Sequence, residues 1–298
     1  MIMQEMPLVS IIIPTYNDGP VVCQAVDCSL NQTYKNREVI VVDDGSTDAT
    51  EQLLKERYQD KIVYVRQENR GPGAARNRGV RNASGKYVQF LDADDLIDRD
   101  KIRMQIDLLK GVPGRALSYC DYVYCDMDDI TVIHKDRYLS PVLQKEKPYY
   151  DIMMKWETEL SIPMHCFLFD VALFKENGIA FDERLPSNED WDCWMDIFAL
   201  QPHVVYIDKV LAYYRIRRGS RCSNRLKMRK GYLWAIDKQI RKNREQRDLV
   251  GKLSIRRKQI KYRYRDVSPL MRLLGLFPPI VKQLYLEKVR WGIQRLFD

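Results

Sequence analysis

The chain has 298 residues, of which 45% are hydrophobic and 30% charged, and its net charge is +8. This composition is typical of a soluble globular protein with one large domain or two modest ones. No run approaches the ~18 apolar residues of a membrane span, and the N-terminus lacks a signal-peptide pattern, so we expect a cytoplasmic protein. The seven cysteines form no Cys-x-x-Cys pair, which argues against a zinc site and predicts free thiols.

Charge is unevenly distributed along the chain. Residues 215–298 hold 25 Lys and Arg against 6 Asp and Glu, whereas residues 1–214 hold 24 against 35. An acidic body therefore carries a basic tail, which indicates two regions with different tasks.

The first hundred residues alternate between short β-branched runs and segments with helical spacing. Four runs are predicted as strands: Leu8–Pro14 and Glu38–Val42, both buried, and then Ile62–Val65 and Tyr87–Leu91. Helices are predicted over Val21–Leu30, from Ser46 to about Tyr58, over Gly73–Asn82 and near Arg99–Leu109. This alternation predicts an α/β fold with a largely parallel sheet and helices on both faces.

Polar residues follow each of the four predicted strands. In chain order, the sequences at these points are TYND, DDGSTD, ENRGPGAARNRG and DADD. Each cluster alone is compatible with a turn. Ligands bind beyond the carboxyl ends of the strands in such sheets, so four clusters along one edge predict a ligand site.

Asp92 and Asp94 stand two residues apart after the fourth predicted strand. Like charges at this spacing repel each other unless a cation lies among them. Carboxylate oxygens are hard ligands that suit Mg²⁺ or Mn²⁺, and these ions commonly bind substrate phosphates as well. We therefore interpret Asp92 and Asp94 as a metal or nucleotide site.

Three further clusters carry groups that suit a nucleotide. Arg76 follows glycines at a predicted helix start, where backbone N–H groups and a guanidinium attract phosphate. Asp43 and Asp44 follow a buried strand and can accept hydrogen bonds from a base or a sugar hydroxyl. Tyr16 can stack on a nucleobase.

Glu189 and Asp190 precede a predicted helix whose apolar stripe includes Trp191 and Trp194. A carboxylate beside tryptophans at a helix start is partly desolvated, which tunes it toward general-base chemistry. An N-cap role is the structural alternative for Asp190.

Five motifs together resemble the family-2 inverting glycosyltransferases with the GT-A fold. They are VSIIIPTYND, VIVVDDGSTD, NRGPGAARNRGVRNASGKYVQFLDADD, NEDWDCW and LAYYRIR, and they cover roughly residues 7–218. The resemblance implies a Rossmann-like, mainly parallel sheet. It also implies transfer of a sugar from a nucleotide diphosphate donor, most often a UDP-sugar, to an acceptor hydroxyl with inversion of configuration, in glycan synthesis.

The resemblance also implies residue roles. The donor would be held by Pro14, Tyr16, Asp43 and Asp44 at the uracil end and by Arg76 beside the nucleotide. Asp92 would contact ribose or metal, and Asp94 would ligate Mn²⁺ or Mg²⁺. Asp190 would be the general base and Glu189 would place the acceptor. All of these residues stand in the matching motifs.

One position departs from the pattern. Many members of the family have Tyr-Arg-x-His after the last core strand, but here Arg217 stands at the histidine position. Arginine does not ligate a metal but does pair with phosphate, so we expect a diphosphate contact from Arg217.

The domain prediction follows the motifs and the charge. Residues 1–218 are predicted as the catalytic domain, with a nucleotide-binding half over about 7–100 and an acceptor half over 101–218. Residues 219–298 are predicted as a basic helical extension that begins with a helix over Gly231–Leu253. Ser268–Phe297 mixes spaced cations with Leu, Phe and Trp, which suits contact with an anionic membrane surface, and packing on the catalytic body is the alternative. We expect a peripheral position at the inner face of the membrane and a glycan or lipid-linked acceptor.

Two other functions compete with this one. A sugar-nucleotide nucleotidyltransferase also has a doubly wound sheet, but it needs a glycine- and arginine-rich loop after the first strand, where this chain has TYNDGP. A nucleic-acid-binding protein would explain the basic tail, but the tail has no recognisable binding module and the body is acidic. We therefore expect no nucleic-acid partner.

Overall fold

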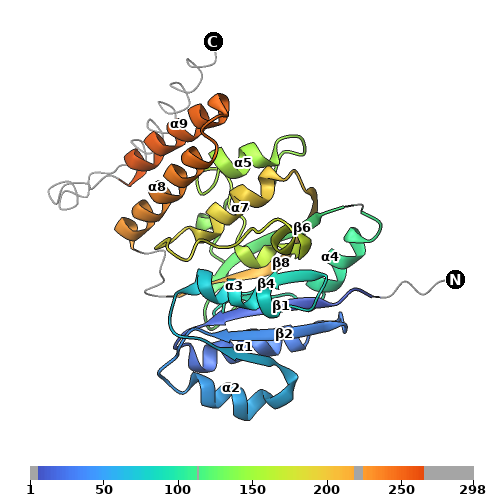
Figure 1. The fold of residues 1–298 in the computed structure, drawn as a ribbon. Coiled ribbons are helices and arrows are strands. Elements are labelled where there is room, and N and C mark those ends of the chain that lie inside the picture. Colours follow the sequence, from blue (N-terminus) through green and yellow to red (C-terminus); the bar gives the residue numbers. More distant parts are fainter. Residues whose placement is uncertain (1–5, 113, 218–223, 265–298) are drawn as a thin grey trace. The chain divides into compact units, whose positions relative to one another are not determined.

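The computed structural model describes residues 6–112, 114–217 and 224–264. Residues 1–260 form one compact unit and residues 261–298 form another. The sheet and the candidate site lie in the first unit (Figure 1).

The fold is built on one eight-stranded mixed sheet with the order β3-β2-β1-β4-β7-β6-β8-β5. The first four strands in sequence are β1 Val9–Thr15, β2 Arg37–Asp43, β3 Val63–Arg66 and β4 Tyr87–Phe90. They pair in parallel, which confirms the prediction for this half of the chain.

The second half of the sheet is mixed. Its strands are β5 Leu96–Ile97, β6 Ala116–Asp126, β7 Leu168–Asp170 and β8 His203–Ile216. β7 runs antiparallel to both β4 and β6, β5 runs antiparallel to β8, and β6 runs parallel to β8. The regular strand–helix alternation that favours parallel pairing therefore applies only to the first half of the chain.

Helices cover both faces of the parallel half. α1 Gly19–Leu30, α2 Thr50–Tyr58 and α4 Lys101–Leu109 share one core cluster with Val9, Ile11 and Ile13 of β1. α3 Pro72–Asn82 packs on the opposite face, where Gly79 touches Ile12. Because alternate strand residues point to opposite faces, the uninterrupted apolar run of β1 serves both layers. α2 begins at Thr50 rather than at Ser46, because the Ser46 hydroxyl accepts a hydrogen bond from Asn17 N (2.9 Å) instead of capping the helix.

An aromatic layer attaches α7 Glu189–Ala199 to the sheet. Trp194 of α7 stacks on Phe169 with ring centroids 4.8 Å apart, and Phe90 of β4 meets Phe181 edge-on at 5.2 Å. Aromatic pairs of this geometry stabilise a core beyond the area they bury. This layer holds the first turn of α7 close to the strand ends. Short helices complete the region: η1 Gln59–Lys61, η2 Lys135–Arg137, α5 Pro148–Met154, η3 Met164–Cys166 and α6 Ala172–Lys175.

Two helices follow β8 in place of the single predicted helix over Gly231–Leu253, which is a correction. They are α8 Arg225–Lys242 and α9 Arg247–Arg263. The break after Lys242 contains neither glycine nor proline, and its stop signals are the weaker ones of basic residues in the last turn followed by Asn243. An ion pair of 2.6 Å between Arg257 and Asp237 joins the two helices.

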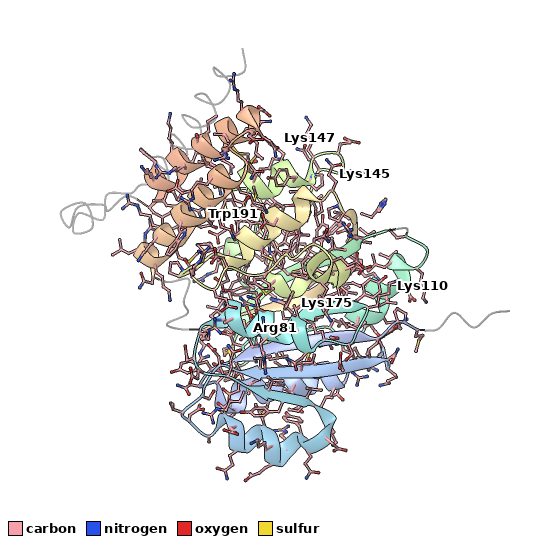
Figure 2. All side chains as sticks on the ribbon, in the orientation of Figure 1. Arg81, Lys110, Lys145, Lys147, Lys175 and Trp191 are labelled. Atoms are coloured by element: carbon pink, nitrogen blue, oxygen red, sulfur yellow. The ribbon has the colours of Figure 1, made fainter. Side chains whose placement is uncertain are left out.

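The first of these helices, α8, packs closely on the body. Tyr232 is fully buried and meets Trp191 edge-on at 5.5 Å, and Figure 2 shows Trp191 between α7 and α8. Asp192 of α7 accepts hydrogen bonds from Gln239 (3.0 Å) and from Lys238. α8 therefore packs on the catalytic body, whereas Ser268–Phe297, for which such packing is the alternative to membrane contact, lie outside the described residues.

Gly231 gives a test of this packing. A Cβ added at Gly231 would lie 2.4 Å from the carbonyl oxygen of Ser187, which is backbone and cannot turn away. We expect Gly231→Ala to lower the free energy of unfolding by about 1–3 kcal/mol, because α8 must shift. The matched control is Gly251→Ala in α9, where a Cβ meets nothing within 4 Å. This control should be neutral or stabilising by up to about 1 kcal/mol, since alanine favours helix. Urea unfolding gives the free energy of unfolding of both variants, and equal values for Gly231→Ala and Gly251→Ala would contradict the close contact at Gly231.

Candidate active site

The loops after the parallel strands meet at one edge of the sheet and bind to one another. Asn17, after β1, accepts a hydrogen bond from Thr47 N, after β2 (2.8 Å). Asp44, also after β2, accepts hydrogen bonds from Arg70 N (2.9 Å) and Gly71 N (2.7 Å) in the loop before α3. These contacts join three of the four predicted polar clusters, and the ion pair between Arg76 and Asp92 (2.7 Å) joins the fourth.

The four residues predicted at the uracil end differ in exposure. Pro14 is buried within β1, and Tyr16 is 46% exposed at the strand end. Both aspartates are buried: Asp43 accepts hydrogen bonds from Ser46 N and the Tyr64 hydroxyl, and Asp44 holds the loop before α3. Their carboxylates thus shape the loops, and Tyr16 offers the exposed surface.

Arg76 lies at the centre of the site. It is 5% exposed, and its guanidinium donates to Asp92 Oδ1 (2.7 Å) and to Glu189 Oε1 (3.0 Å). Burial lowers the pKa of Arg76, but the charges of Asp92 and Glu189 outweigh it and raise that pKa above its usual value. Three predicted site residues from β4, α3 and α7 are therefore joined through one buried cation.

Among the described carboxylates of this region, Asp94 has its negative charge least neutralised by nearby cations. Burial, together with the charges of Asp95, Asp92 and Asp18, raises the pKa of Asp94 to about 7. Asp92 and Asp18 each pair with an arginine and Asp95 pairs with His165, whereas no ion pair to the Asp94 carboxylate is seen among the described residues. The site thus concentrates negative charge at Asp94.

Arg217 lies beside this charge. Its guanidinium donates to Asp18 Oδ1 at 2.5 Å, and its side chain is 42% exposed. The hydrogen bond to Asp18 raises the pKa of Arg217, against the effect of partial burial, and the charge of Asp94 adds to it. The cation that replaces the family histidine therefore stands at the edge of the carboxylate cluster.

Asp95 and Arg215 fix the loop that carries Asp92 and Asp94. Buried Asp95 accepts a hydrogen bond from Arg215 N (2.9 Å) and pairs with His165 Nδ1 (3.1 Å). Arg215, in β8, also donates from Nε to the carbonyl oxygen of Asp94 (2.5 Å). His165 is 1% exposed, so it is a packed histidine.

Asp190 stands in the first turn of α7, where the chain turns sharply. Asn188, the residue before α7 begins, has φ of 61°, a left-handed conformation that is uncommon outside glycine and often found at functional sites. Burial, together with the charge of Glu189, raises the pKa of Asp190 to about 7. Asp190 therefore has the pKa that a general base needs near neutral pH.

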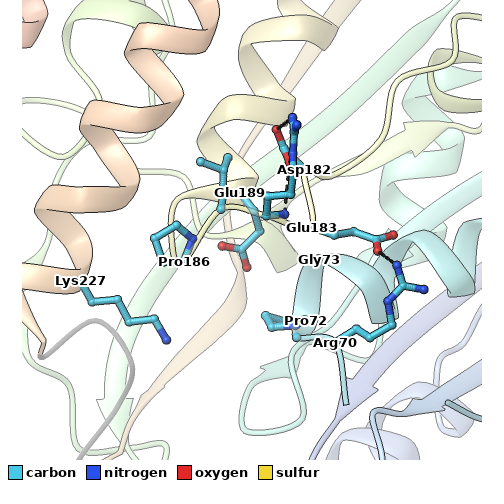
Figure 3. A pocket seen from close by; sticks show the side chains of 11 residues that line it. Arg70, Pro72, Gly73, Asp182, Glu183, Pro186, Glu189 and Lys227 are labelled. Carbon is cyan, nitrogen blue, oxygen red and sulfur yellow. Dashed lines mark hydrogen bonds and ion pairs between the residues drawn. The ribbon is translucent and has the colours of Figure 1, made fainter. Parts of the chain in front are cut away.

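A pocket of about 240 Å³ opens next to Glu189 (Figure 3). It is lined by residues 70–73 before and at the start of α3, by residues 182–186, by Glu189 and by Lys227 of α8. Glu189 is the predicted site residue that reaches this pocket. Among the described residues, no group of three or more His, Cys, Asp or Glu side chains is placed to hold a metal ion.

Four residues of the site were not assigned from the sequence. Asp18 stood in the TYND cluster and Arg215 in the YYRIR motif, so both carried a positional signal. Asp95 stands beside the predicted ligands in DADD, and nothing in this motif distinguishes its role from theirs. Lys227 had no signal, because it comes from a helix whose cations lie on most of its surface.

Comparisons with known proteins agree with this geometry. The sequence model of glycosyl transferase family 2 matches residues 10–178, more than half of the chain. An uncharacterized glycosyltransferase of Rickettsia typhi is 36% identical over 233 residues, which are 77% of this chain and 71% of the relative.

Solved structures show the same fold. S. aureus TarS 1–349 in complex with UDP-GlcNAc superimposes with a TM-score of 0.63 at 22% identity, over 83% of this chain and 72% of that one. A mannosyltransferase from Pyrobaculum calidifontis in complex with GDP-Man and Mn²⁺ gives 0.57 at 21% identity, over 80% and 65%. The fold is thus the GT-A type expected from the motifs. The chain belongs to glycosyl transferase family 2 and is a glycosyltransferase.

Proposed function

We propose that the protein transfers a sugar from a UDP-sugar to a hydroxyl of a glycan or lipid-linked acceptor with inversion, and that Asp190 is the general base. The observation that carries this proposal is the Asp190 carboxyl, whose pKa is raised to about 7 beside the Arg76 bridge. The structural neighbours that bind UDP-GlcNAc or GDP-Man support a nucleotide-sugar donor.

In this mechanism the base and the leaving group act on opposite sides of the sugar carbon. The Asp190 carboxylate takes the proton of the acceptor hydroxyl while the oxygen of that hydroxyl forms a bond to the anomeric carbon. The bond from that carbon to the β-phosphate breaks, and the nucleoside diphosphate leaves. One in-line displacement inverts the configuration.

The Arg76 bridge orients the groups around this reaction. Glu189 accepts from Arg76 through Oε1 and borders the pocket, so it can receive a hydrogen bond from the acceptor. Asp92 is held by the other guanidinium nitrogen on the donor side. Arg76 thereby fixes the spacing between the donor and acceptor sides and contributes positive charge near the nucleotide.

The residues at the carboxylate cluster fit a divalent cation. Asp94 carries a raised pKa and no ion pair within the described residues, and its oxygens are hard ligands. We propose that Asp94 and Asp92 would hold Mn²⁺ or Mg²⁺. When bound, such an ion neutralises the charge that develops on the leaving diphosphate.

The donor would lie along the strand ends. Tyr16 is exposed for stacking on uracil, while Pro14, Asp43 and Asp44 shape the loops behind it. Arg217 pairs with Asp18 and is partly exposed, so its guanidinium can also bind diphosphate oxygens.

The first prediction for this mechanism concerns Asp190. Because a general base acts only when ionised, kcat should rise about tenfold per pH unit below pH 7 and level off above it. Asp190→Asn should lower kcat by ~100-fold to 10,000-fold and remove this limb of the pH profile. Calorimetry should give the same affinity for UDP in the variant, since the base faces the acceptor. Equal loss of UDP affinity would make Asp190 a donor ligand.

The second prediction concerns Asp94. Folding raises its pKa, so the stability that its protonated form provides is lost as pH rises through about 7. Without metal at pH 8, Asp94→Asn should therefore raise the free energy of unfolding by about 1–3 kcal/mol. The same variant should lose Mn²⁺-dependent binding of UDP.

Asp128→Asn, at an exposed aspartate outside the site, is the matched control and should change neither property. Full turnover of a UDP-sugar by the wild-type protein in EDTA would contradict the metal proposal.

Attachment to a membrane is a separate part of the proposal. It depends on Ser268–Phe297, which lie outside the described residues. Within the part of the chain that the structure describes, no helix is both long and apolar enough to cross a bilayer. We propose that residues 1–218 carry catalysis and that the basic extension over 219–298 brings the enzyme to anionic lipid at the inner face of the membrane.

Flotation with vesicles tests the attachment. The protein should float with anionic vesicles at low salt and less as salt rises through 0.15 M, where the Debye length is about 8 Å. A truncation that tests the extension must keep α8, because α8 packs on the body and its removal after Gly219 would destabilise the protein. We therefore choose a variant that lacks only residues 266–298, and we expect it not to float. Retained flotation of that variant, or RNA binding without vesicle binding, would contradict the proposal.

A further inference from the structure

We infer that the pocket between the start of α3 and the start of α8 binds an anionic group of the acceptor glycan, a sugar carboxylate or a phosphate, through Lys227. This inference rests on the proposed function, because it places the acceptor beside Asp190. It concerns a residue of the C-terminal helices, which lie outside the matched residues 10–178.

The pocket is joined to the catalytic residues by direct contacts. A Cβ added at Gly73, in the pocket wall, would lie 3.5 Å from Glu189 Cγ, so the start of α3 touches Glu189. The Ser187 hydroxyl donates to the carbonyl oxygen of Lys227 (3.0 Å) only three residues before Asp190. A group held in the pocket is thereby next to the turn that carries the base.

The backbone around Lys227 is fixed, and its side chain enters the pocket. Lys227 N donates to the N-cap residue Asn224 (3.0 Å), and its carbonyl is held by Ser187. Figure 3 shows the side chain extending from α8 into the pocket, toward the side of Pro72 and Glu189. The Lys227 ammonium therefore extends into the pocket from a backbone that is fixed by hydrogen bonds on both sides.

The pocket lining carries three acids and three cations, but Glu189 is paired with Arg76 from outside the lining, which leaves Lys227 without a partner acid among the described residues. The three acids in its lining each have a cation: Asp182 pairs with Arg184 (2.8 Å), Glu183 with Arg70 (2.6 Å), and Glu189 with Arg76 (3.0 Å). For Lys227, also in the lining, no ion pair is seen among the described residues. An anion that enters the pocket would complete this pattern.

The size of the pocket favours a sugar unit over a donor. About 240 Å³ is below the ~300 Å³ at which small-molecule pockets usually begin, which favours a single sugar unit over a whole nucleotide-sugar. Arg70 and Gly71 donate their N–H groups to Asp44 and Pro72 has none, so the start of α3 supports negative charge through its positive helix end. Room for one sugar-sized unit, a spare ammonium and a helix start together indicate an anionic unit of the acceptor.

Protection of Lys227 from acetylation tests the inference on the full-length protein with UDP present. The probes are a uronic-acid tetrasaccharide, a glycerol phosphate oligomer and a neutral N-acetylglucosamine tetrasaccharide. Acetylation of each lysine is followed by mass spectrometry, and Lys230, exposed on α8 outside the pocket, is the internal control. We expect at least one of the two anionic probes to slow acetylation of Lys227 severalfold, with Lys230 unaffected.

Variants measure the affinity itself. Lys227→Gln should weaken binding of the protecting oligosaccharide about tenfold or more, because a charge-assisted contact is lost, whereas Lys230→Gln should bind like wild type. Protection by the uronic-acid probe alone assigns a carboxylate, and protection by the phosphate probe alone assigns a phosphate.

Two outcomes would overturn the inference. Equal protection by the neutral probe would make the pocket a site for uncharged sugar, and no protection by any probe would make Lys227 a solvated surface lysine. Binding of UDP is measured on the same preparations. Absent UDP binding contradicts the proposed function, whereas UDP binding without protection contradicts only the anionic pocket.

Discussion

The site depends on one buried ion bridge, from Arg76 to Asp92 and Glu189. Removing a lone guanidinium from water costs several kcal/mol, so Arg76 is tolerated inside only because two carboxylates meet it with short hydrogen bonds. Those carboxylates come from the end of β4 and the start of α7, about a hundred residues apart in the chain. The same bridge that stabilises Arg76 therefore sets the spacing of the donor and acceptor sides.

Charge that this bridge does not neutralise is left at two carboxyls with raised pKa, Asp94 and Asp190. Each is held where the ionised form is disfavoured, and the proposed mechanism uses one beside the leaving diphosphate and the other beside the attacking hydroxyl. The surrounding aromatic layer and the Asp95–Arg215 contacts keep both loops in place despite the repulsion. In that mechanism, binding of a cation and of the acceptor would offset this repulsion.

Sequence patterns predicted the parallel half of the sheet and its ligand edge well, because short β-branched apolar runs and polar strand ends are local signals. They did not predict the mixed half, in which β7 and β8 return to the sheet through long-range pairings that no local period encodes. Individual carboxylates were found by motif, but the partners that position them were not. Arg215 and Asp95 act through contacts between residues 120 positions apart, which only the fold brings together.

The donor and acceptor sides of the proposed site also differ in how far a local sequence pattern can specify them. The donor side is built from strand ends and glycine-rich loops whose backbone geometry is encoded locally, so a family motif can specify it. On the proposed function, the acceptor side is completed by α8, which is held by the close approach of Gly231 to Ser187 and by the Asp192 hydrogen bonds. A helix that docks on the turn before Asp190 can change its pocket-facing residue without disturbing the donor loops. Lys227 occupies that position here, so the proposed function would let acceptor choice diverge while the chemistry at Asp190 stays the same.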